Sequence, residues 1–321
     1  MKISHFEAGL LCALKLDADI PLKQVAEKLG KSVSTVRAAV ADLEEREVIR
    51  FYPLVNVHRL GYSLFRLYFT PVAAQEEALF RSLNEHSHVS WFARFSSDLH
   101  KYCASFVCRS PLHYSTIISE LGAQHGACLH SSATQMQINL TLFNPKHLLP
   151  EKIDLGSVSV KAEGPVVQID ERDNLILSGL LHHRYSSIRD LARQLDVAHS
   201  TVHERVNFFK QSGILERFTY LPNISAVGLD VYRALIKARS LHPDVRKEFF
   251  EFCRHHPLIT VLLECFGTWD FEIGLESPDR SSVDATINLL TKQFGKLLEV
   301  VDVMKREERT KDTCYPFYHR P

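Results

Sequence analysis

One stretch in the second half of the chain, "HSTVHERVNFFK", places polar side chains between apolar residues at helical spacing. Val202, Val206 and Phe209 recur at this spacing, so they predict one buried helix face. The polar side chains then point outward or along the helix edge. Serine, threonine, asparagine and lysine are residue types that contact phosphates and base edges of duplex DNA. The candidate DNA-binding residues of this helix are His199, Ser200, Thr201, His203, Asn207 and Lys210.

An earlier stretch, "KSVSTVRAAVADLEE", has the same apolar spacing but a different polar surface. Acidic residues follow its basic ones, and their charges oppose phosphate binding. Residues 1–62 hold nine Lys/Arg against eight Asp/Glu, and residues 170–229 hold seven of each, so neither region has the basic excess of a strong DNA binder. The alternative is that both helices are packing or protein-contact modules. The candidate DNA-binding residues of the earlier helix are Lys31, Ser34, Thr35 and Arg37.

Other chemistries have little support in the sequence. His199 and His203 are four residues apart, a spacing that suits two metal ligands on one helix, but no third ligand accompanies them. Dinucleotide-binding, P-loop and nucleophile-elbow motifs are absent from the sequence. Seven scattered cysteines without CxxC spacing predict neither a disulfide framework nor a zinc ribbon. We therefore predict no metal, no cofactor and no catalytic group.

The two stretches belong to a repeat with an offset of 166 residues. Before each, an apolar set spaced i, i+3, i+4, i+7 predicts another helix, and a further apolar segment precedes that one. Each half therefore opens with three helices, and the short break before the third suits a helix-turn-helix in which Ser32 caps the first copy. The two matching apolar sets are Leu22, Val25, Ala26 and Leu29, and Ile188, Leu191, Ala192 and Leu195.

The region after each helix triplet alternates between strand-like and helix-like segments in the order βαββαβ, the ferredoxin-like arrangement. Alternation along 259–266 predicts that Ile259, Val261, Leu263 and Cys265 share one face of a strand. The fold class is therefore α+β, with two copies of a winged or helix-turn-helix domain, each followed by a ferredoxin-like domain. Predicted strands are 63–70, 89–95, 101–108, 134–142, 230–238, 259–266, 269–276 and 298–305, and predicted helices are 76–85, 112–125, 243–255 and 280–294.

Five segments follow from this pattern. The bridge between the halves contains three prolines and two glycines without a helical period, so we interpret it as a linker. The predicted segments are helix-turn-helix domain 1 at 1–52, ferredoxin-like domain 1 at 60–143, the linker at 144–168, helix-turn-helix domain 2 at 169–219 and ferredoxin-like domain 2 at 228–310.

This arrangement resembles the Lrp/AsnC family of transcription regulators, whose ferredoxin-like part is the RAM domain. The second half carries the stronger likeness, in "QIDERDNLILSGL", "STVHERVNFFKQSGIL" and "CFGTWDFEIGLESPD". The first half departs from the pattern. Glu47 is at the position that corresponds to Gly213 in the second half, and Ala39 is at the position that corresponds to Arg205. The hairpin segment "FSSDLHKYCASF" is two residues longer than the tight hairpin of the second half.

The resemblance implies a sequence-specific DNA-binding regulator modulated by a small molecule such as an amino acid. In such proteins the sheets pair into a dimer, and effectors bind near the hairpin, which here contains Gly267, Trp269 and Asp270. A tandem chain would form an intrachain pseudo-dimer, with further homo-oligomerisation. A purely structural hairpin, in which Gly267 permits the turn and Asp270 accepts hydrogen bonds, is an equal alternative.

A second family shares this architecture. The chain is also similar to siroheme decarboxylases of haem biosynthesis, which resemble Lrp/AsnC proteins, occur as paired or fused units, and hold substrate carboxylates with basic and histidine residues. The residues that suit such a cluster are Arg94, His100, Lys101 and Tyr102. The His- and Tyr-rich strand pattern of those enzymes is not at the matching place, so this function is the alternative. A scaffold that has lost both roles is a third.

Composition limits the partner classes. The formal net charge is zero, so the whole chain offers no electrostatic argument for a nucleic-acid or membrane partner. No apolar stretch approaches the ~18 residues of a membrane helix, and the first residues lack the pattern of a secretory signal. These observations predict a cytoplasmic protein. The resemblance to Lrp/AsnC regulators implies that its macromolecular partner is double-stranded DNA.

Overall fold

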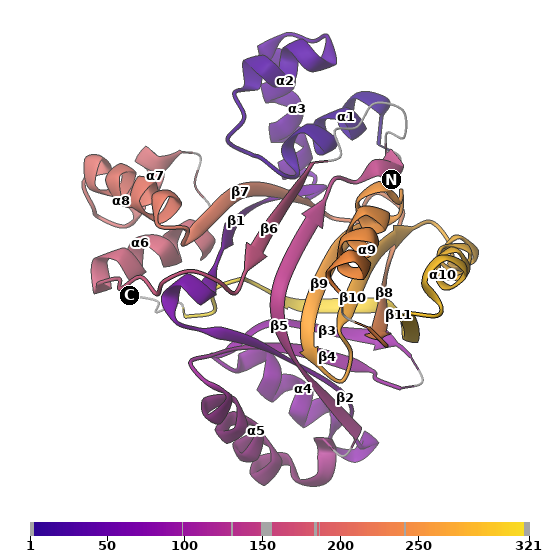
Figure 1. Cartoon of the computed structure of the whole chain (residues 1–321). Helices are drawn as coiled ribbons and strands as arrows, with labels where there is room; N and C mark the ends of the chain where they lie inside the picture. The colour runs from indigo at the N-terminus through magenta and orange to yellow at the C-terminus, as the bar shows by residue number, and fades with distance from the viewer. Residues whose placement is uncertain are drawn as a thin grey trace. The chain divides into compact units, whose positions relative to one another are not determined.

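The structure is a computed structural model that describes residues 3–97, 99–129, 131–148, 156–182, 185, 187–240 and 242–317 (Figure 1). The predicted α+β class and the duplicated order are confirmed. The first half contains α1 His5–Leu14, α2 Leu22–Leu29, α3 Val33–Glu45, β1 Ile49–Val55, β2 Ser63–Thr70, α4 Glu76–Glu85, β3 Val89–Ser96, β4 Tyr102–Cys108, α5 Pro111–His125 and β5 Ser131–Phe143. The second contains β6 Ser157–Lys161, α6 Glu171–His182, α7 Ile188–Gln194, α8 His199–Gln211, β7 Leu215–Pro222, β8 Asp230–Ala238, α9 Pro243–His255, β9 Ile259–Gly267, β10 Phe271–Ser277, α10 Arg280–Phe294 and β11 Leu298–Asp312.

Helix starts follow local sequence signals in the first helix-turn-helix. The Ser4 side chain accepts a hydrogen bond from the Glu7 backbone N–H, and Glu7 Oε2 accepts one from the Ser4 N–H, which makes a capping box at α1. Ser32 caps α3, as predicted, by accepting from the Thr35 N–H at 3.1 Å. These caps satisfy backbone donors that a helix leaves unpaired, so they fix where α1 and α3 begin.

Left-handed backbone positions repeat in both helix-turn-helix domains. Gly30 and Asp196, which are 166 residues apart, have φ values of 61° and 53° in the turn before the third helix. Glu47 and Gly213 have φ values of 54° and 72° after that helix. The turn geometry is therefore the same in both copies, although each copy places its glycine at only one of the two positions.

Gly30→Ala is expected to lower the free energy of unfolding by about 1 kcal/mol. A Cβ added at Gly30 would meet no atom within 4 Å, so the loss would come from the left-handed backbone alone. Gly122→Ala in α5 is the matched control, because its Cβ also meets open space but lies in a helix, and stability should rise by ~0.5–1 kcal/mol. Urea denaturation of both variants measures the change in the free energy of unfolding. If both variants gained or both lost stability, the left-handed backbone of Gly30 would not be the cause of its loss.

The chain divides into two compact units, and each unit combines parts of both repeats. Unit 1 combines residues 1–52 with 139–159 and 217–306, and therefore joins the first helix-turn-helix to the second ferredoxin-like domain. Unit 2 combines residues 53–138, 160–216 and 307–321, and joins the first ferredoxin-like domain to the second helix-turn-helix. The predicted linker contributes to both units and contains strand β6, while its residues 149–155 lie outside the described residues.

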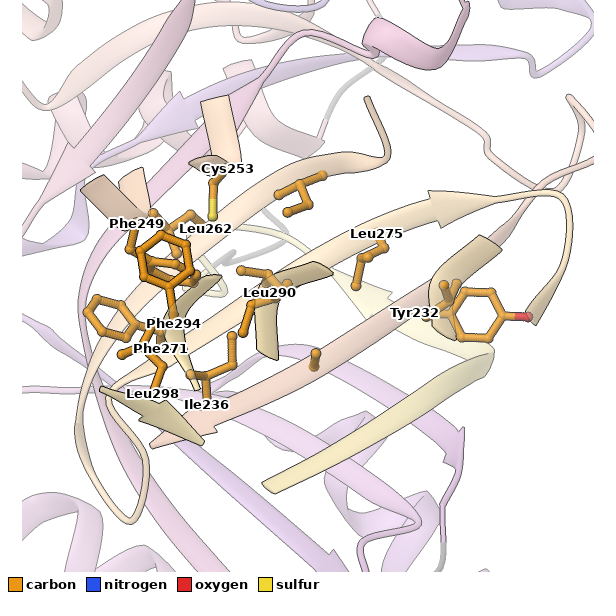
Figure 2. Close-up of a cluster of buried hydrophobic side chains, with 14 of the residues drawn as sticks. Tyr232, Ile236, Phe249, Cys253, Leu262, Phe271, Leu275, Leu290, Phe294 and Leu298 are labelled. Atoms are coloured by element: carbon orange, nitrogen blue, oxygen red, sulfur yellow. The ribbon is translucent and has the colours of Figure 1, made fainter. Parts of the chain in front are cut away.

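The sheet of unit 1 has the strand order β11-β8-β10-β9-β5, in which β8 to β11 form the predicted ferredoxin-like arrangement. Helices α9 and α10 cover one face around a core that includes Phe249, Phe271, Leu290 and Phe294 (Figure 2). The prediction that Ile259 shares a face of β9 with Val261, Leu263 and Cys265 is wrong. Ile259 lies in this core together with Leu262, because the β9–β10 register shifts between Gly274 and Leu275.

A buried charge cluster joins α1 to this domain within unit 1. Glu276 of β10 lies 3.8 Å from Lys15 Nζ and 3.5 Å from His147 Nε2, and it accepts a hydrogen bond from the Thr260 hydroxyl. Burial opposes ionisation of Glu276, but the Lys15 charge, the nearby imidazole and the hydroxyl keep its pKa below the usual range. Because burial also lowers the pKa of His147, Lys15 is the main counter-charge.

Acid should weaken unit 1 through His256. Burial, with a contribution from Lys146, lowers the pKa of His256 to about 4, so the neutral form is favoured in the folded protein. The stabilisation is present above the unfolded value near pH 6.5 and is lost as pH falls to about 4. We expect this to cost about 1–2 kcal/mol after allowance for solvent screening. Thermal unfolding between pH 7 and 4 should show a smaller loss in His256→Gln than in the exposed control His255→Gln, and equal losses would contradict this assignment.

The sheet of unit 2 has the order β5-β2-β4-β3-β11. Helices α4 and α5 contribute Leu79, Leu83, Ile117 and Leu121 to a core with the strands. Strand β3 ends at Ser96 and β4 begins at Tyr102, whereas β9 ends at Gly267 and β10 begins at Phe271. The connection is therefore longer in the first half, as the sequence predicts.

Candidate nucleic-acid interface

Helix α8 exposes its polar face, as the sequence predicts. Val202, Val206 and Phe209 are buried. Thr201 is half-buried, and an Asn207 Nδ2 to His203 Nδ1 contact of 3.3 Å links two side chains on the polar face. The polar face therefore lies on one side of a helix whose apolar side is fixed in the core. The exposed candidate residues are His199, Ser200, His203, Asn207 and Lys210.

An ion pair fixes α8 against α6. Arg205 Nε lies 2.8 Å from Asp173 Oδ1, and the Asp173 side chain is 7% exposed. The Arg205 guanidinium also lies 4.3 Å from the Phe208 ring centroid. A charge pair with one buried partner resists separation, because a lone buried carboxylate is costly. This contact sets the orientation of the α8 polar face within its own domain.

Helix α3 offers a weaker surface for phosphate. Lys31, Ser34, Thr35 and Arg37 are exposed, and Lys31 Nζ lies 5.7 Å from the Phe6 ring centroid. The Ser32 hydroxyl lies 2.8 Å from the Ser34 hydroxyl and 2.8 Å from the Thr35 hydroxyl, within hydrogen-bond distance of both. Exposed acidic residues follow these polar side chains on the same helix. The acidic residues are Asp42, Glu44 and Glu45, with Glu47 just beyond the helix.

The first helix-turn-helix holds its helices together with a different ion pair. Arg46 Nη1 lies 2.7 Å from Glu7 Oε1 and 2.6 Å from Asp42 Oδ2. Glu7 stands 166 residues before Asp173, but its arginine comes from the end of α3 and not from the middle, where Ala39 replaces Arg205. The sequence shows the Ala39 departure but does not reveal the compensating pair. Glu7 and Arg46 are 39 residues apart, so no local sequence signal could have found this pair.

The hairpin residues predicted to bind an effector are engaged in the hairpin itself. Trp269 is 1% exposed. Asp270 Oδ2 accepts a hydrogen bond from the Ala238 N–H at 2.8 Å and lies 3.2 Å from Lys237 Nζ. Gly267 has a φ of 149°, which favours glycine, and its carbonyl accepts from Lys237 Nζ at 3.5 Å. These contacts fit the structural role that the sequence left open for Gly267 and Asp270.

The alternative cluster in the first-half hairpin lies on two faces of the sheet. Tyr102 packs in the helix-covered core, donates to Glu76 at 2.5 Å, and has its pKa raised to about 12 by burial and by this hydrogen bond. Arg94 pairs with Tyr102 in the β3–β4 register. His100 instead packs beside Tyr68, on the opposite face, and Lys101 is exposed. The four residues therefore do not gather at one point.

A buried arginine lies on the sheet face of unit 1 opposite the core that α9 and α10 cover. Arg233 of β8 is 9% exposed and lies 3.4 Å from Glu272 Oε1. Its Nε and Nη1 atoms have no hydrogen-bond partner among the described residues. The guanidinium occupies the space above Gly274, where a Cβ would come within 2.7 Å of Nη1. The sequence gives no signal for Arg233 as a buried residue, because a basic residue in a strand is usually solvent-exposed.

Metal sites and membrane spans can be judged only for the described residues. No group of three or more His, Cys, Asp or Glu side chains there is arranged to hold a metal ion. Among the same residues, no helix combines the length and the apolar character needed to cross a membrane.

Comparison with known proteins gives matches to both halves. The winged helix-turn-helix DNA-binding family matches residues 6–50 and 169–216. The HTH-type transcriptional regulator FL11 of Pyrococcus abyssi is 31% identical over 126 residues, which cover 39% of this chain and 81% of that protein. The HTH-type transcriptional regulator LrpA of Pyrococcus horikoshii is 40% identical over 72 residues, or 22% of this chain and 50% of that protein.

A solved structure matches nearly the whole chain. The siroheme decarboxylase NirDL aligns with a TM-score of 0.63, 11% sequence identity, and coverage of 98% of this chain and 95% of that one. The same protein in co-complex with an iron-uroporphyrin III analogue aligns with a TM-score of 0.62. At this identity the likeness establishes a shared duplicated fold and leaves the activity to other evidence.

Proposed function

Because the chain belongs to the Lrp/AsnC family of helix-turn-helix transcriptional regulators, we propose that it binds specific sequences of double-stranded DNA mainly through helix α8. The observation that carries the proposal is the exposed polar face of α8, in a domain that matches the winged helix-turn-helix DNA-binding family. His203, Asn207 and Lys210 would contact base edges and phosphates from the major groove.

The two helix-turn-helix domains would contribute unequally. Arg37 of α3 would meet phosphate, but the acidic end of the same helix opposes the approach of a second one. The equivalent end of α8 carries Lys210 where α3 carries Glu44. The proposed DNA site is therefore asymmetric, with α3 in a supporting role.

Several finer features belong to the same proposal. We infer a cytoplasmic regulator that responds to a small molecule such as an amino acid, near Gly267, Trp269 and Asp270. We also infer an intrachain pseudo-dimer with further homo-oligomerisation, and the five segments 1–52, 60–143, 144–168, 169–219 and 228–310 as its building blocks. The resemblance to Lrp/AsnC regulators supports the effector and the pairing of the sheets, and the duplicated order of elements supports the segments.

Gel-shift titration with genomic fragments tests the proposed function. We expect a preferred fragment to bind ~10³-fold more tightly than competitor DNA at equal salt. The logarithm of the affinity should fall linearly with the logarithm of salt, by about 0.9 per phosphate contacted. Equal binding to all fragments, or no binding at low salt, would refute sequence-specific DNA recognition.

A siroheme decarboxylase-like activity is the second candidate, supported by the fold likeness to NirDL over nearly the whole chain. The buried guanidinium of Arg233, which lies 3.4 Å from Glu272 Oε1, would have to take a tetrapyrrole carboxylate as an additional or exchanged partner. Titration with iron-uroporphyrin III, followed by visible absorbance, tests binding. Mass spectrometry after incubation with siroheme tests carbon dioxide loss. Absence of both signals would remove this candidate.

A further inference from the structure

In unit 1, a short segment after β5 is anchored on the ferredoxin-like domain by a buried lysine. Lys146 is 5% exposed, and its Nζ donates to the carbonyl oxygens of Ile259 at 2.8 Å and Cys253 at 3.2 Å. These carbonyls flank the turn between α9 and β9. Burial lowers the pKa of Lys146 to about 8.

The same segment then contacts the first helix-turn-helix. The Pro145 carbonyl accepts from Cys12 Sγ of α1 at 3.8 Å, and Leu148 packs against the hydrophobic core that surrounds α1. His147 lies beside Glu276, which also faces Lys15 at the end of α1. We call residues 144–148 strap 1. It lies between α1 and the α9–β9 turn within one unit.

In unit 2, the end of β11 makes an equivalent arrangement. Lys311 Nζ donates to the His86 carbonyl at 2.7 Å, in the turn between α4 and β3. The Thr313 N–H donates to the Ser90 carbonyl of β3 at 2.8 Å. Burial lowers the pKa of Lys311 as well. A lysine that follows β5 in unit 1, or lies near the end of β11 in unit 2, is therefore anchored on a helix-to-strand turn in both units.

The segment after Lys311 then contacts the second helix-turn-helix. The Tyr315 hydroxyl donates to Asn174 Oδ1 of α6 at 2.7 Å, and the Tyr315 carbonyl lies 3.0 Å from His182 Nε2. Phe317 packs on Tyr62 with a centroid distance of 4.8 Å, and its carbonyl accepts from the Ser178 hydroxyl. We call residues 311–317 strap 2. It holds α6 as strap 1 holds α1.

The two anchoring turns are alike in detail. His256 Nδ1 accepts from the Leu258 N–H at 3.3 Å in unit 1, and His86 Nδ1 accepts from the His88 N–H at 3.1 Å in unit 2. Each lysine therefore bonds to a turn in which a histidine ring accepts a hydrogen bond from a backbone N–H two residues later. Because the ammonium bonds to backbone carbonyls, removing it leaves buried acceptors unsatisfied at that turn.

We propose that straps 1 and 2 are equivalent mechanical links, anchored by Lys146 and Lys311, that hold each helix-turn-helix against the ferredoxin-like domain of its unit. A displacement of either anchoring turn moves the strap and so changes the freedom of α1 or α6. The links pass through different lysines, so the two helix-turn-helix domains are controlled separately. This proposal does not depend on DNA binding, because it concerns only the contacts that hold each helix-turn-helix on its ferredoxin-like domain.

Hydrogen exchange on the full chain, followed by mass spectrometry, tests the straps. Lys146→Met keeps the apolar stem and removes the donor, and it should speed amide exchange in α1 roughly tenfold while α6 is unchanged. Lys311→Met should do the reverse. Lys292→Met, on the exposed face of α10, is the matched control and should alter neither helix.

Tyr315→Phe provides a milder test of strap 2, because it removes only the hydrogen bond to Asn174. It should speed exchange in α6 by a few-fold and leave α1 unchanged. If Lys146→Met unfolds the chain, Lys311→Met and Tyr315→Phe decide the outcome. The proposal is overturned if α1 and α6 respond together in these variants, or if neither responds.

Discussion

Asp173→Ala is expected to lower the free energy of unfolding of the second helix-turn-helix by about 3 kcal/mol. The Asp173 carboxylate is buried and lies 2.8 Å from Arg205 Nε, so its removal leaves a guanidinium without a counter-charge. Asp173 Oδ2 also lies 3.5 Å from the Asp170 N–H at the start of α6. Urea denaturation followed by circular dichroism measures the loss.

A double-mutant cycle separates the pair from its surroundings. Arg205→Leu in the Asp173→Ala background should recover part of the lost stability, because no lone charge then remains. Arg193→Ala is the matched control: it breaks an exposed pair with Asp190, so it should cost less than ~0.5 kcal/mol. A loss of equal size in Asp173→Ala and Arg193→Ala would show that burial of Asp173 contributes nothing.

His203→Ala combined with Asn207→Ala should lower the affinity for the preferred DNA fragment by about 10- to 100-fold. Both side chains are exposed on α8 and contact each other at 3.3 Å, so removing both deletes one continuous polar surface. Neither is in the core, and the fold should keep its stability within ~0.5 kcal/mol. Fluorescence anisotropy at fixed salt measures the affinity.

The matched variant is Ser34→Ala combined with Arg37→Ala on α3. Because acidic residues share that helix, we expect a smaller loss of affinity, within about tenfold. A larger loss in the α3 variant than in the α8 variant would reverse the proposed asymmetry. Unchanged affinity in both variants would place DNA recognition outside the two helix pairs.

Local sequence signals predicted the elements well. The apolar spacing of Val202, Val206 and Phe209 predicted the buried face of α8, and Ser32 predicted the start of α3. These features depend on residues within one or two turns of each other, so they can be read without the tertiary fold. The register shift at Gly274 could not be predicted, because it depends on how two strands meet.

The candidate site was predictable in part. The exposed face of α8 follows from helical periodicity, and the structure exposes five of the six residues expected there, with Thr201 half-buried. The partners that hold the helices were not predictable. Glu7 pairs with Arg46 in one copy and Asp173 with Arg205 in the other, so the same task is done by arginines at different helix positions.

The sequence by itself determined the duplication, the helix-turn-helix units and the order of strands and helices, because periodicity and capping act over short distances along the chain. Only the tertiary structure decided that each unit combines a helix-turn-helix from one repeat with a ferredoxin-like domain from the other. Two repeats with the same pattern offer equivalent surfaces for pairing. Which surfaces meet depends on long-range contacts such as Lys15 with Glu276 and Tyr315 with Asn174, and no local pattern encodes them.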